Sequence, residues 1–375
     1  MRHGILAFAL LVAACGGREA ASPRFVAEGN PPLLSDWGMM TSNGRELVLG
    51  EGVIPYDLNM ALFSDYAHKQ RTLWMPDGVS AGYREDGVLD FPVGTVITKT
   101  FYYPGGRGAG EVLQTTGTAD GWRPGGLDLS GIRLVETRIL ARRETGWIAL
   151  PYVWNEEQTE AELRRAGGIE RLTLIAPDGN RQDFAYAVPD ANQCAGCHAV
   201  DNTTRAIQPI GPAPRHINRD YDYADGPRNQ LAEFAAHGYL AGWPGAGTAP
   251  RAAALSDPDA GIEDRARSYL DINCAHCHNP AGPADTSGLH LQHDAPPGPN
   301  LGLCKLPIAA GGGTGGRRFS IMPGEPDDSI LVYRMETNDP GAMMPELGRA
   351  VRHEEGIALI RDWISRMEPD CHGAG

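Results

Sequence analysis

The pentapeptide pattern Cys-x-x-Cys-His occurs twice, at Cys194–His198 and at Cys274–His278. It is the attachment signature of c-type haem, in which the two thiols add to the vinyl groups of the porphyrin. The histidine that follows then lies beneath the iron as an axial ligand. A redox dithiol or half of a zinc site would use the same residue types, but no further paired Cys or His cluster stands at zinc-finger spacing. The sequence therefore predicts two covalently bound haem c groups, held by Cys194, Cys197, Cys274 and Cys277, with His198 and His278 as iron ligands.

The N-terminus has the features of a bacterial secretory signal. Arg2 precedes an apolar stretch from Ile5 to Val12 that is too short to span a bilayer. Small residues then end in Cys15, which resembles a lipobox, so we interpret residues 1–14 as a lipoprotein signal peptide and Cys15 as the lipid anchor. An ordinary cleaved signal is the alternative. Gly16 after the cysteine favours the outer membrane, and the expected location is that of a periplasm-facing lipoprotein.

The formal net charge of the chain is −14 at pH 7. Such an acidic chain should not bind nucleic acid, because phosphate recognition depends on clustered Lys and Arg. Acidity suits docking to a redox protein with a basic face, although it is also a general route to solubility. Redox protein partners are therefore the expected partners. The oligomeric state is left open.

The pattern of the chain changes near residue 188. After a linker at residues 15–30, residues 31–188 contain short apolar runs bounded by Gly, Pro and Asp, which indicate a β-rich domain. Strands are expected at Thr95–Tyr103 and Ile148–Trp154, and a hairpin around Pro177–Asn180. Within this domain, Asn155–Ala166 is expected to form a helix, because acidic residues precede Arg164 and Arg165.

Beyond residue 188, apolar residues recur at the spacing that is typical of an amphipathic helix. Residues 189–259 are expected to form the first haem region, and residues 260–375 a cytochrome c-like domain with the second haem. Helices are predicted at Ile262–Cys274, Ser329–Met335 and His353–Met367, and a further one near Asn229–His237. The predicted fold class is α+β, with a β-rich N-terminal domain followed by mainly helical cytochrome c-like haem domains.

A low-spin haem needs a sixth ligand, and Met344 is the candidate for the second haem. It forms a Met-Pro step on the loop between the two last helices, and a thioether ligand favours ferrous iron. Met343 and Met322 are the alternatives, as is a purely apolar role for Met344. Arg317 and Arg318 are candidate partners of the haem propionates, because guanidinium groups suit planar carboxylates.

The first haem has no methionine between its motif and the second motif. His216 is the first candidate for its sixth ligand and His237 the second. A sixth ligand from the β-rich domain would explain why this domain and the haem regions belong to one chain. The candidates there are His68, Met60 and Met75. His276, inside the second motif, is expected to point away from its own iron and to ligate nothing.

Cys304 and Cys371 remain once lipid and haem attachment are assigned. In an oxidising compartment a leftover pair of cysteines usually forms a disulfide. The sequence therefore predicts a Cys304–Cys371 bridge.

The segment Ala266–Pro280 resembles the second haem segment of a family of bacterial dihaem c-type cytochromes that have a β-rich N-terminal domain. The segments Pro55–Asn59, Leu62–Ala67 and Asn218–Tyr221 are also similar to that family. This resemblance implies haem binding and electron transfer. The segment Phe91–Lys99 resembles β-rich cytochromes in which a lysine cross-links haem, but no haem motif lies within the β-rich domain, so this likeness implies only a fold.

The expected function is thus electron transfer by a dihaem c-type cytochrome in the periplasm or at the outer membrane. The alternative is a dihaem peroxidase-like oxidoreductase with the first haem as its reaction centre, which the missing methionine favours. Against this alternative, no acid–base pair is evident in the sequence near the first motif. A third possibility is a binding module in which the β-rich domain recognises a carbohydrate or a protein.

Overall fold

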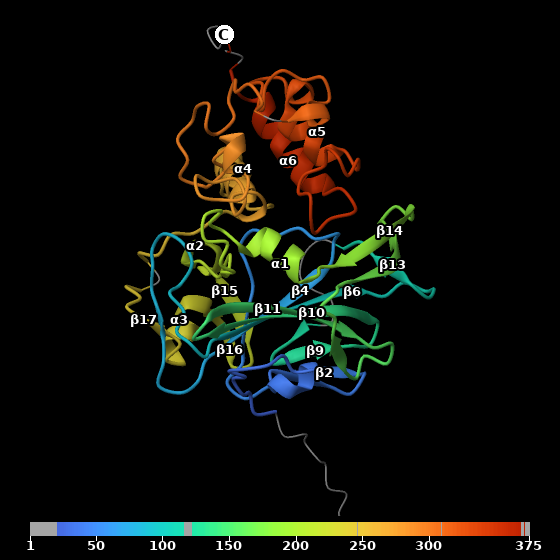
Figure 1. Ribbon diagram of the computed structural model, residues 1–375, viewed down its shortest axis with the longest axis vertical. Coiled ribbons are helices and arrows are strands. Elements are labelled where there is room, and N and C mark those ends of the chain that lie inside the picture. The colour runs from blue at the N-terminus through green and yellow to red at the C-terminus, as the bar shows by residue number, and fades with distance from the viewer. Residues whose placement is uncertain (1–20, 116–121, 246, 309, 369–370, 372–375) are drawn as a thin grey trace, which may run out of the picture.

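The largest element of the molecule is a six-stranded antiparallel sheet with the strand order β12-β11-β10-β6-β4-β3 (Figure 1). The structure is a computed structural model and describes residues 21–115, 122–245, 247–308, 310–368 and 371. The strands of this sheet are β3 (Ile54–Tyr56), β4 (His68–Trp74), β6 (Val96–Pro104), β10 (Ile132–Arg143), β11 (Gly146–Trp154) and β12 (Ala161–Leu163). In the central strand β6, every residue except Lys99 is buried, as expected for a strand that is covered on both faces.

Four smaller sheets surround the large one. Their orders are β1-β2-β9-β8, β14-β13-β7, β15-β16 and β17-β5. Their strands are β1 (Met40–Ser42), β2 (Glu46–Leu49), β5 (Ala81–Gly82), β7 (Glu111–Leu113), β8 (Trp122–Arg123), β9 (Gly126–Asp128), β13 (Gly168–Ile175), β14 (Arg181–Val188), β15 (Asp220–Tyr223), β16 (Gly226–Asn229) and β17 (Leu240–Ala241). Since β17 pairs in parallel with β5, the segment that follows the first motif is hydrogen-bonded to the N-terminal part of the chain.

The helices lie mainly on one side of the large sheet. They are α1 (Ala191–His198), α2 (Pro214–Ile217), α3 (Gln230–Ala236), α4 (Ile262–Asn273), α5 (Ile330–Glu336) and α6 (Glu354–Ser365). Short 3₁₀ helices occur at Leu34–Trp37, Asp285–Ser287, Gly311–Thr314 and Pro326–Asp328. Figure 1 shows α1 between the sheet and the part of the chain that contains α4, α5 and α6. The first haem motif is therefore placed between the two halves of the molecule.

Several local predictions are confirmed. The expected strands correspond to β6 and β11, and the expected hairpin is β13–β14. The four expected helices correspond to α3, α4, α5 and α6. The bridge between Cys304 and Cys371 is also present.

The helix predicted at Asn155–Ala166 is wrong. Asn155 instead begins a turn, in which its Oδ1 accepts a hydrogen bond from the Thr159 backbone N–H at 2.9 Å, and Gln158 has a φ of 57°. The chain then returns as β12 and pairs with β11. The side chain of an Asn that caps a turn competes with helix formation, and this local bond outweighed the favourable charge pattern.

The predicted fold class is also wrong in its second half. Strands account for 27% and helices for 20% of the structure, and no helical cytochrome c-like domain is evident in the described residues. Beyond residue 260, the loops that join α4, α5 and α6 are longer than the helices themselves. The apolar spacing identified each helix, but the Gly- and Pro-rich segments between them, which cannot continue a helix, make up most of this region.

The two halves of the chain share one hydrophobic core. Ile54 and Leu73 of the large sheet belong to the same buried cluster as Leu231 of α3, Leu270 of α4 and Ile360 of α6. A second buried cluster lies within the N-terminal half, and a third joins side chains of that half to Val351. The common core fixes the position of the helices relative to the sheet, and with it the positions of the two motifs.

Candidate functional site

The first Cys-x-x-Cys-His motif lies on α1. Asp190 caps this helix, since its Oδ1 accepts hydrogen bonds from the backbone N–H groups of Asn192 and Gln193 at 2.7 and 2.8 Å. In return, Gln193 Oε1 accepts from the Asp190 N–H at 3.0 Å, which completes a capping box. His198 is the last residue of the helix, and its Nδ1 lies 2.8 Å from the carbonyl oxygen of Gln208. A proton on Nδ1 is required for this bond, so Nε2 keeps its lone pair.

The second motif follows α4, where Cys274 is the C-cap residue. His278 Nδ1 lies 3.1 Å from Ser287 Oγ, and this hydroxyl donates to the Ala284 carbonyl oxygen at 2.7 Å. The serine oxygen therefore accepts the Nδ1 proton of His278, and Nε2 is again left with its lone pair. Both motif histidines thus have the orientation and tautomer that are typical of a metal-binding imidazole.

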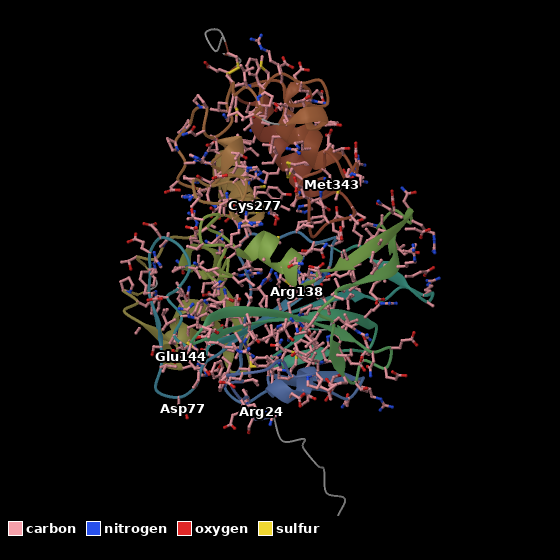
Figure 2. The ribbon with its side chains drawn as sticks, in the orientation of Figure 1. Arg24, Asp77, Arg138, Glu144, Cys277 and Met343 are labelled. Carbon is pink, nitrogen blue, oxygen red and sulfur yellow. A yellow bond between two sulfur atoms is a disulfide. The ribbon has the colours of Figure 1, made fainter. Side chains whose placement is uncertain are left out.

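A cavity of about 420 Å³, which we call the second-motif cavity, opens beside the second motif. Cys274, Cys277 and His278 line it. Its apolar wall comes from α5, α6 and the neighbouring loops and includes Leu289, Leu291, Ile330, Met335 and Ile357. Met344 lines the same cavity, whereas neither Met343 nor Met322 does. The structure therefore brings Met344 together with the second motif and leaves out its two alternatives; Figure 2 labels Met343 and Cys277 in this part of the molecule.

Two arginines, the half-buried Arg334 and the buried Arg349, also line the second-motif cavity. Arg349 is 7% exposed, and its Nη2 donates to the carbonyl oxygens of Arg334 and Thr337 at 3.0 and 2.8 Å. Its Nε and Nη1 have no hydrogen-bond partner in the described part of the chain. Arg317 and Arg318, which the sequence suggested, lie instead over the rings of Tyr333 and Phe319 and do not line the cavity. No sequence pattern marks Arg349, because only the tertiary fold buries it.

The first motif borders a second cavity, of about 170 Å³, which we call the first-motif cavity. Cys194, Cys197 and His198 form one side of it. The opposite side comes from the large sheet and includes Ile97, Lys99, Arg138, Leu140 and Leu150. The β-rich part of the chain is therefore a wall of this cavity, and Lys99 faces the motif although the motif lies outside the β-rich sequence.

The first-motif cavity is lined by three basic side chains and by no carboxylate of the described residues. Arg71 pairs with Asp57 at 3.0 Å, and Arg138 pairs with the fully buried Glu136 at 2.5 Å. Lys99, on β6, has no carboxylate within ion-pair distance among the described residues, and its ammonium lies 5.2 Å from the centre of the Phe101 ring. Figure 2 shows Arg138 on the sheet directly beneath α1.

Burial controls the protonation of the groups around both motifs. It lowers the pKa of Lys99 to about 7, with a further contribution from the charges of Arg138 and Arg71. Burial, together with Lys99, lowers the pKa of His198 to about 3, and burial with Arg334 lowers that of His278 to about 4. Both motif histidines are therefore neutral at pH 7 and keep the lone pair that a metal ion requires.

His216, the first candidate for the sixth ligand of the first haem, lies on α2 and lines the first-motif cavity. Its side chain is 7% exposed, and its Nε2 lies 2.9 Å from Asp271 Oδ2. The structure thus brings His216 to the first motif, and it also shows that one imidazole nitrogen is already engaged by a carboxylate. No sequence pattern marks this pair, since its members are distant in the chain.

The other candidate ligands do not line the first-motif cavity. His237 interacts with Glu233 at the end of α3, and His68 Nε2 lies 2.5 Å from Thr115 Oγ1. Met60 and Met75 are buried in the shared hydrophobic core. His276, by contrast, lines both cavities, although it was expected to have no role as a ligand.

The two motifs are in contact with one another. Cys277 Sγ lies 4.0 Å from the carbonyl oxygen of Gly196, and Cys197 and His276 line both cavities. The two cavities therefore adjoin, although their motifs are 80 residues apart in the chain, from 194 to 274.

Among the described residues, no group of three or more His, Cys, Asp or Glu side chains is arranged to bind a metal ion. A haem iron takes only one or two ligands from the protein, so such clusters do not identify haem sites. The described helices are all too short or too polar to cross a bilayer. The predicted signal peptide and Cys15 lie outside the described residues.

Comparisons with protein families, with curated proteins and with solved structures each found no match to this chain.

Proposed function

We propose that this chain is a dihaem c-type cytochrome that transfers electrons between redox proteins. The observation that carries the proposal is the geometry of the two Cys-x-x-Cys-His motifs. Each places two thiols and a neutral imidazole with a free Nε2 at a largely apolar cavity, and the two cavities adjoin. When bound, haem supplies one-electron redox chemistry at its iron. The protein then contributes attachment, axial ligands and the electrostatic surroundings.

At the second motif, Cys274 and Cys277 would hold the haem covalently, with His278 and Met344 as the axial ligands. The cavity of about 420 Å³ is in the size range of cofactor sites, and its lining is mainly apolar. Arg349 supports this assignment, because its two unpartnered nitrogens match the need of a buried propionate for a cationic partner. A thioether ligand in an apolar site favours the reduced state and gives a high reduction potential.

At the first motif, Cys194 and Cys197 would attach the haem and His198 would ligate it. The cavity of about 170 Å³ is smaller than usual for a cofactor, but it adjoins the second-motif cavity through Cys197 and His276. Arg71 and Arg138 already pair with Asp57 and Glu136, so Lys99 is the basic side chain of this lining that could pair with a haem propionate. His216 stays the predicted candidate for the sixth position.

The contact between the two motifs supports direct electron exchange between the haems. Cys277 Sγ and the Gly196 carbonyl oxygen are 4.0 Å apart, so the attachment points of the two cofactors lie side by side. Because their ligands and surroundings differ, the haems would have different potentials, and electrons would have a preferred direction between partners. We place the protein on the periplasmic side of the outer membrane, anchored through a lipid at Cys15.

The test of this proposal is the haem content of protein that was matured in a bacterial periplasm. We expect two covalent haems per chain by the pyridine haemochrome assay, and two one-electron steps in a potentiometric titration. Colourless protein in which all four motif thiols react with an alkylating reagent would refute the proposal.

A second candidate function is a peroxidase-like oxidoreductase with the first haem as its reaction centre. The sequence showed no acid–base pair near the first motif, but in the structure His216 lines the first-motif cavity and its Nε2 lies 2.9 Å from Asp271 Oδ2. Peroxide-dependent oxidation of an electron donor by the purified holoprotein would favour this candidate, and two haems that do not react with peroxide would favour the carrier.

A further inference from the structure

His353 lines the second-motif cavity and has no part in the proposed attachment or ligation of haem. It is the N-cap residue of α6, but its side chain makes no capping hydrogen bond with the helix. The ring instead stacks on Phe63, with 4.3 Å between the ring centroids and an angle of 10° between the ring planes. The side chain is 12% exposed. The imidazole is therefore a mostly buried polar group of the cavity, and stacking fixes its orientation.

Both ring nitrogens of His353 face an oxygen atom. Nδ1 lies 3.0 Å from Tyr269 Oη, and Tyr269, on α4, also lines the cavity. Nε2 lies 3.6 Å from Glu355 Oε2, which accepts a hydrogen bond from Tyr66 Oη at 2.8 Å. The side chain of Glu355 is 35% exposed. Tyr269, His353 and Glu355 thus form a row of polar groups from the cavity to the solvent.

Helix α6 leaves room for the contact between His353 and Tyr269. Gly356 is buried in the first turn of this helix. A Cβ at this position would come within 2.6 Å of His353 Nδ1 and closer still to Tyr269 Oη. Glycine within a helix is less favourable than alanine, but any larger residue here would push the two side chains away. The glycine therefore preserves the pair, although it weakens the helix.

Few groups in the second-motif cavity can change their charge. Outside the two motifs, the titratable side chains among its described lining residues are Tyr269, Glu346 and His353, because arginine stays protonated. Burial raises the pKa of Tyr269, so its hydroxyl keeps the proton. Glu346 is exposed, so water and salt screen its charge. His353 is therefore the buried group of this lining that can gain a proton.

The surroundings of His353 oppose a charge on the ring in some respects and favour it in others. Burial, with a smaller contribution from the charge of Lys69, lowers the pKa of His353 to about 4, so the imidazole is neutral at pH 7. The positive end of the α6 dipole acts in the same direction. The carboxyl group of Glu355 would stabilise an imidazolium. Besides Glu355, the titratable or charged groups around the ring are Tyr66, Lys69, Tyr269, Arg349, Arg352 and Glu354.

We propose that His353 binds one proton from the solvent when the second haem site receives one electron, and releases it when the electron leaves. The inference rests on the proposed function, since it requires haem at the second motif. The electron comes from a redox protein and goes to the iron. Glu355 keeps the proton of the neutral ring on Nε2, so the incoming proton forms an N–H bond at Nδ1, which then donates to Tyr269 Oη. Glu355 is thus a positioning residue.

The apolar lining of the cavity supplies the physical reason. A charge that enters an apolar site is costly unless an opposite charge accompanies it. One electron and one proton together leave the net charge of the site unchanged. By linkage, a proton on His353 raises the midpoint potential as much as reduction favours the proton. The midpoint potential should therefore fall as the pH rises from the pKa of His353 in the oxidised protein to its pKa in the reduced protein.

The test is a potentiometric titration of the holoprotein with two haems between pH 4 and pH 8, in which the haem of higher potential is followed. We expect reduction to raise the proton affinity of His353 at least tenfold, which equals 59 mV between the acidic and alkaline limits of the fitted curve. In His353→Phe, which keeps an aromatic ring beside Phe63, the fall should be absent. The control is His237→Phe, an exposed histidine outside the cavity lining, which should keep the fall.

Two further measurements separate proton binding from a structural role. Glu355→Gln should move the fall to lower pH without abolishing it, because the imidazolium loses a nearby negative charge. A curve that this variant leaves in place would refute the role of Glu355. If His353→Phe does not fold, an NMR pH titration of the wild type provides the comparison. The His353 imidazole should then titrate at a higher pH in the reduced than in the oxidised protein.

Two results would overturn the inference. One is a wild-type midpoint potential that does not change between pH 4 and pH 8. The other is an equal fall in His353→Phe, which would assign the proton to another group, such as a haem propionate. A haem content below two per chain would instead be the failure of the proposed function, and the pyridine haemochrome assay shows it before the titration begins.

Discussion

The same five-residue pattern occurs in two different environments. The second motif borders an apolar cavity between short helices, with a methionine and a partly unpaired arginine in its lining. The first motif faces a β-sheet that presents Arg71, Lys99 and Arg138, with no methionine in the lining. Identical local chemistry for attachment is thus combined with different axial candidates and different electrostatics. The surroundings of each motif, rather than the motif itself, would therefore set the potential and reactivity of each haem.

The strongest test of the comparison removes one motif at a time. Cys194→Ala/Cys197→Ala and Cys274→Ala/Cys277→Ala should each lower the haem content from two to one per chain, because the thioether bonds are independent. Pyridine haemochrome assays and the mass of the intact protein measure this. The loss of both haems from either double variant would show that the two sites do not act separately.

The next test concerns the axial ligand of the second site. Met344→Ala should lower the higher midpoint potential by on the order of 0.1 V, well inside the roughly 0.8 V that axial ligands span. The other midpoint potential should stay in place. Met343→Ala is the matched control, since this neighbouring side chain does not line the cavity. A shift of equal size in both variants would argue against Met344 as the ligand.

A third test addresses the contact between the β-rich region and the C-terminal region. Asp65 follows β3 in the chain, and its Oδ1 accepts hydrogen bonds from the Ala350 and Val351 backbone N–H groups at 2.6 and 2.9 Å. Burial raises the pKa of this carboxyl group to about 6. Between about pH 4 and pH 6, the folded state therefore binds the proton more tightly than the unfolded state does, and Asp65 reduces stability as the pH rises through this window.

Asp65→Asn keeps an acceptor for both backbone groups and removes this titration. Relative to the variant, the wild-type free energy of unfolding should fall by roughly 2–3 kcal/mol between pH 4 and pH 7. Urea denaturation at several pH values measures the difference, with the exposed Asp259→Asn as control. Parallel curves for the wild type and Asp65→Asn would contradict the expectation.

The smallest expected effect concerns Lys99 in the first site. A cation stabilises the reduced state of a nearby haem, so Lys99→Met should lower the midpoint potential of the first haem by on the order of 50 mV. Because burial lowers the pKa of Lys99 to about 7, the shift should be present at pH 6 and largely absent at pH 8. Potentiometric titration at both pH values checks this. A shift in the midpoint potential of the second haem as well would show that Lys99 does not distinguish the two sites.

Much of the local structure could be predicted from the sequence, because it depends on local chemistry. The spacing of Ile262, Ala266 and Tyr269 identified α4, and the residues Pro177–Asn180 identified the turn of the β13–β14 hairpin. The prediction failed where a side chain competes with the backbone, as at Asn155. It also failed for the C-terminal half as a whole, since helix patterns reveal helices but not the length of the loops that separate them.

The residues of the candidate sites also fall into two groups: those that a sequence pattern marks and those that only the fold brings together. The motif cysteines and histidines are adjacent in the chain, and Met344 is marked by the proline that follows it. The signal for Arg349 and Asp271 is absent from the sequence, because each becomes important only when distant segments meet. Arg317 and Arg318 were chosen for their residue type alone, and the fold directs them elsewhere.

By itself, the sequence determined the covalent chemistry that is available: two dithiol-histidine motifs, a further cysteine pair, and a methionine on a proline-containing loop. These features consist of residues that are close in the chain or can be paired by elimination. Only the tertiary structure decided that the two motifs touch, that a β-sheet forms one wall of the first cavity, and that His216 meets Asp271. The physical reason is that burial and charge pairing depend on contacts between distant segments, and those contacts form only when the shared core is packed.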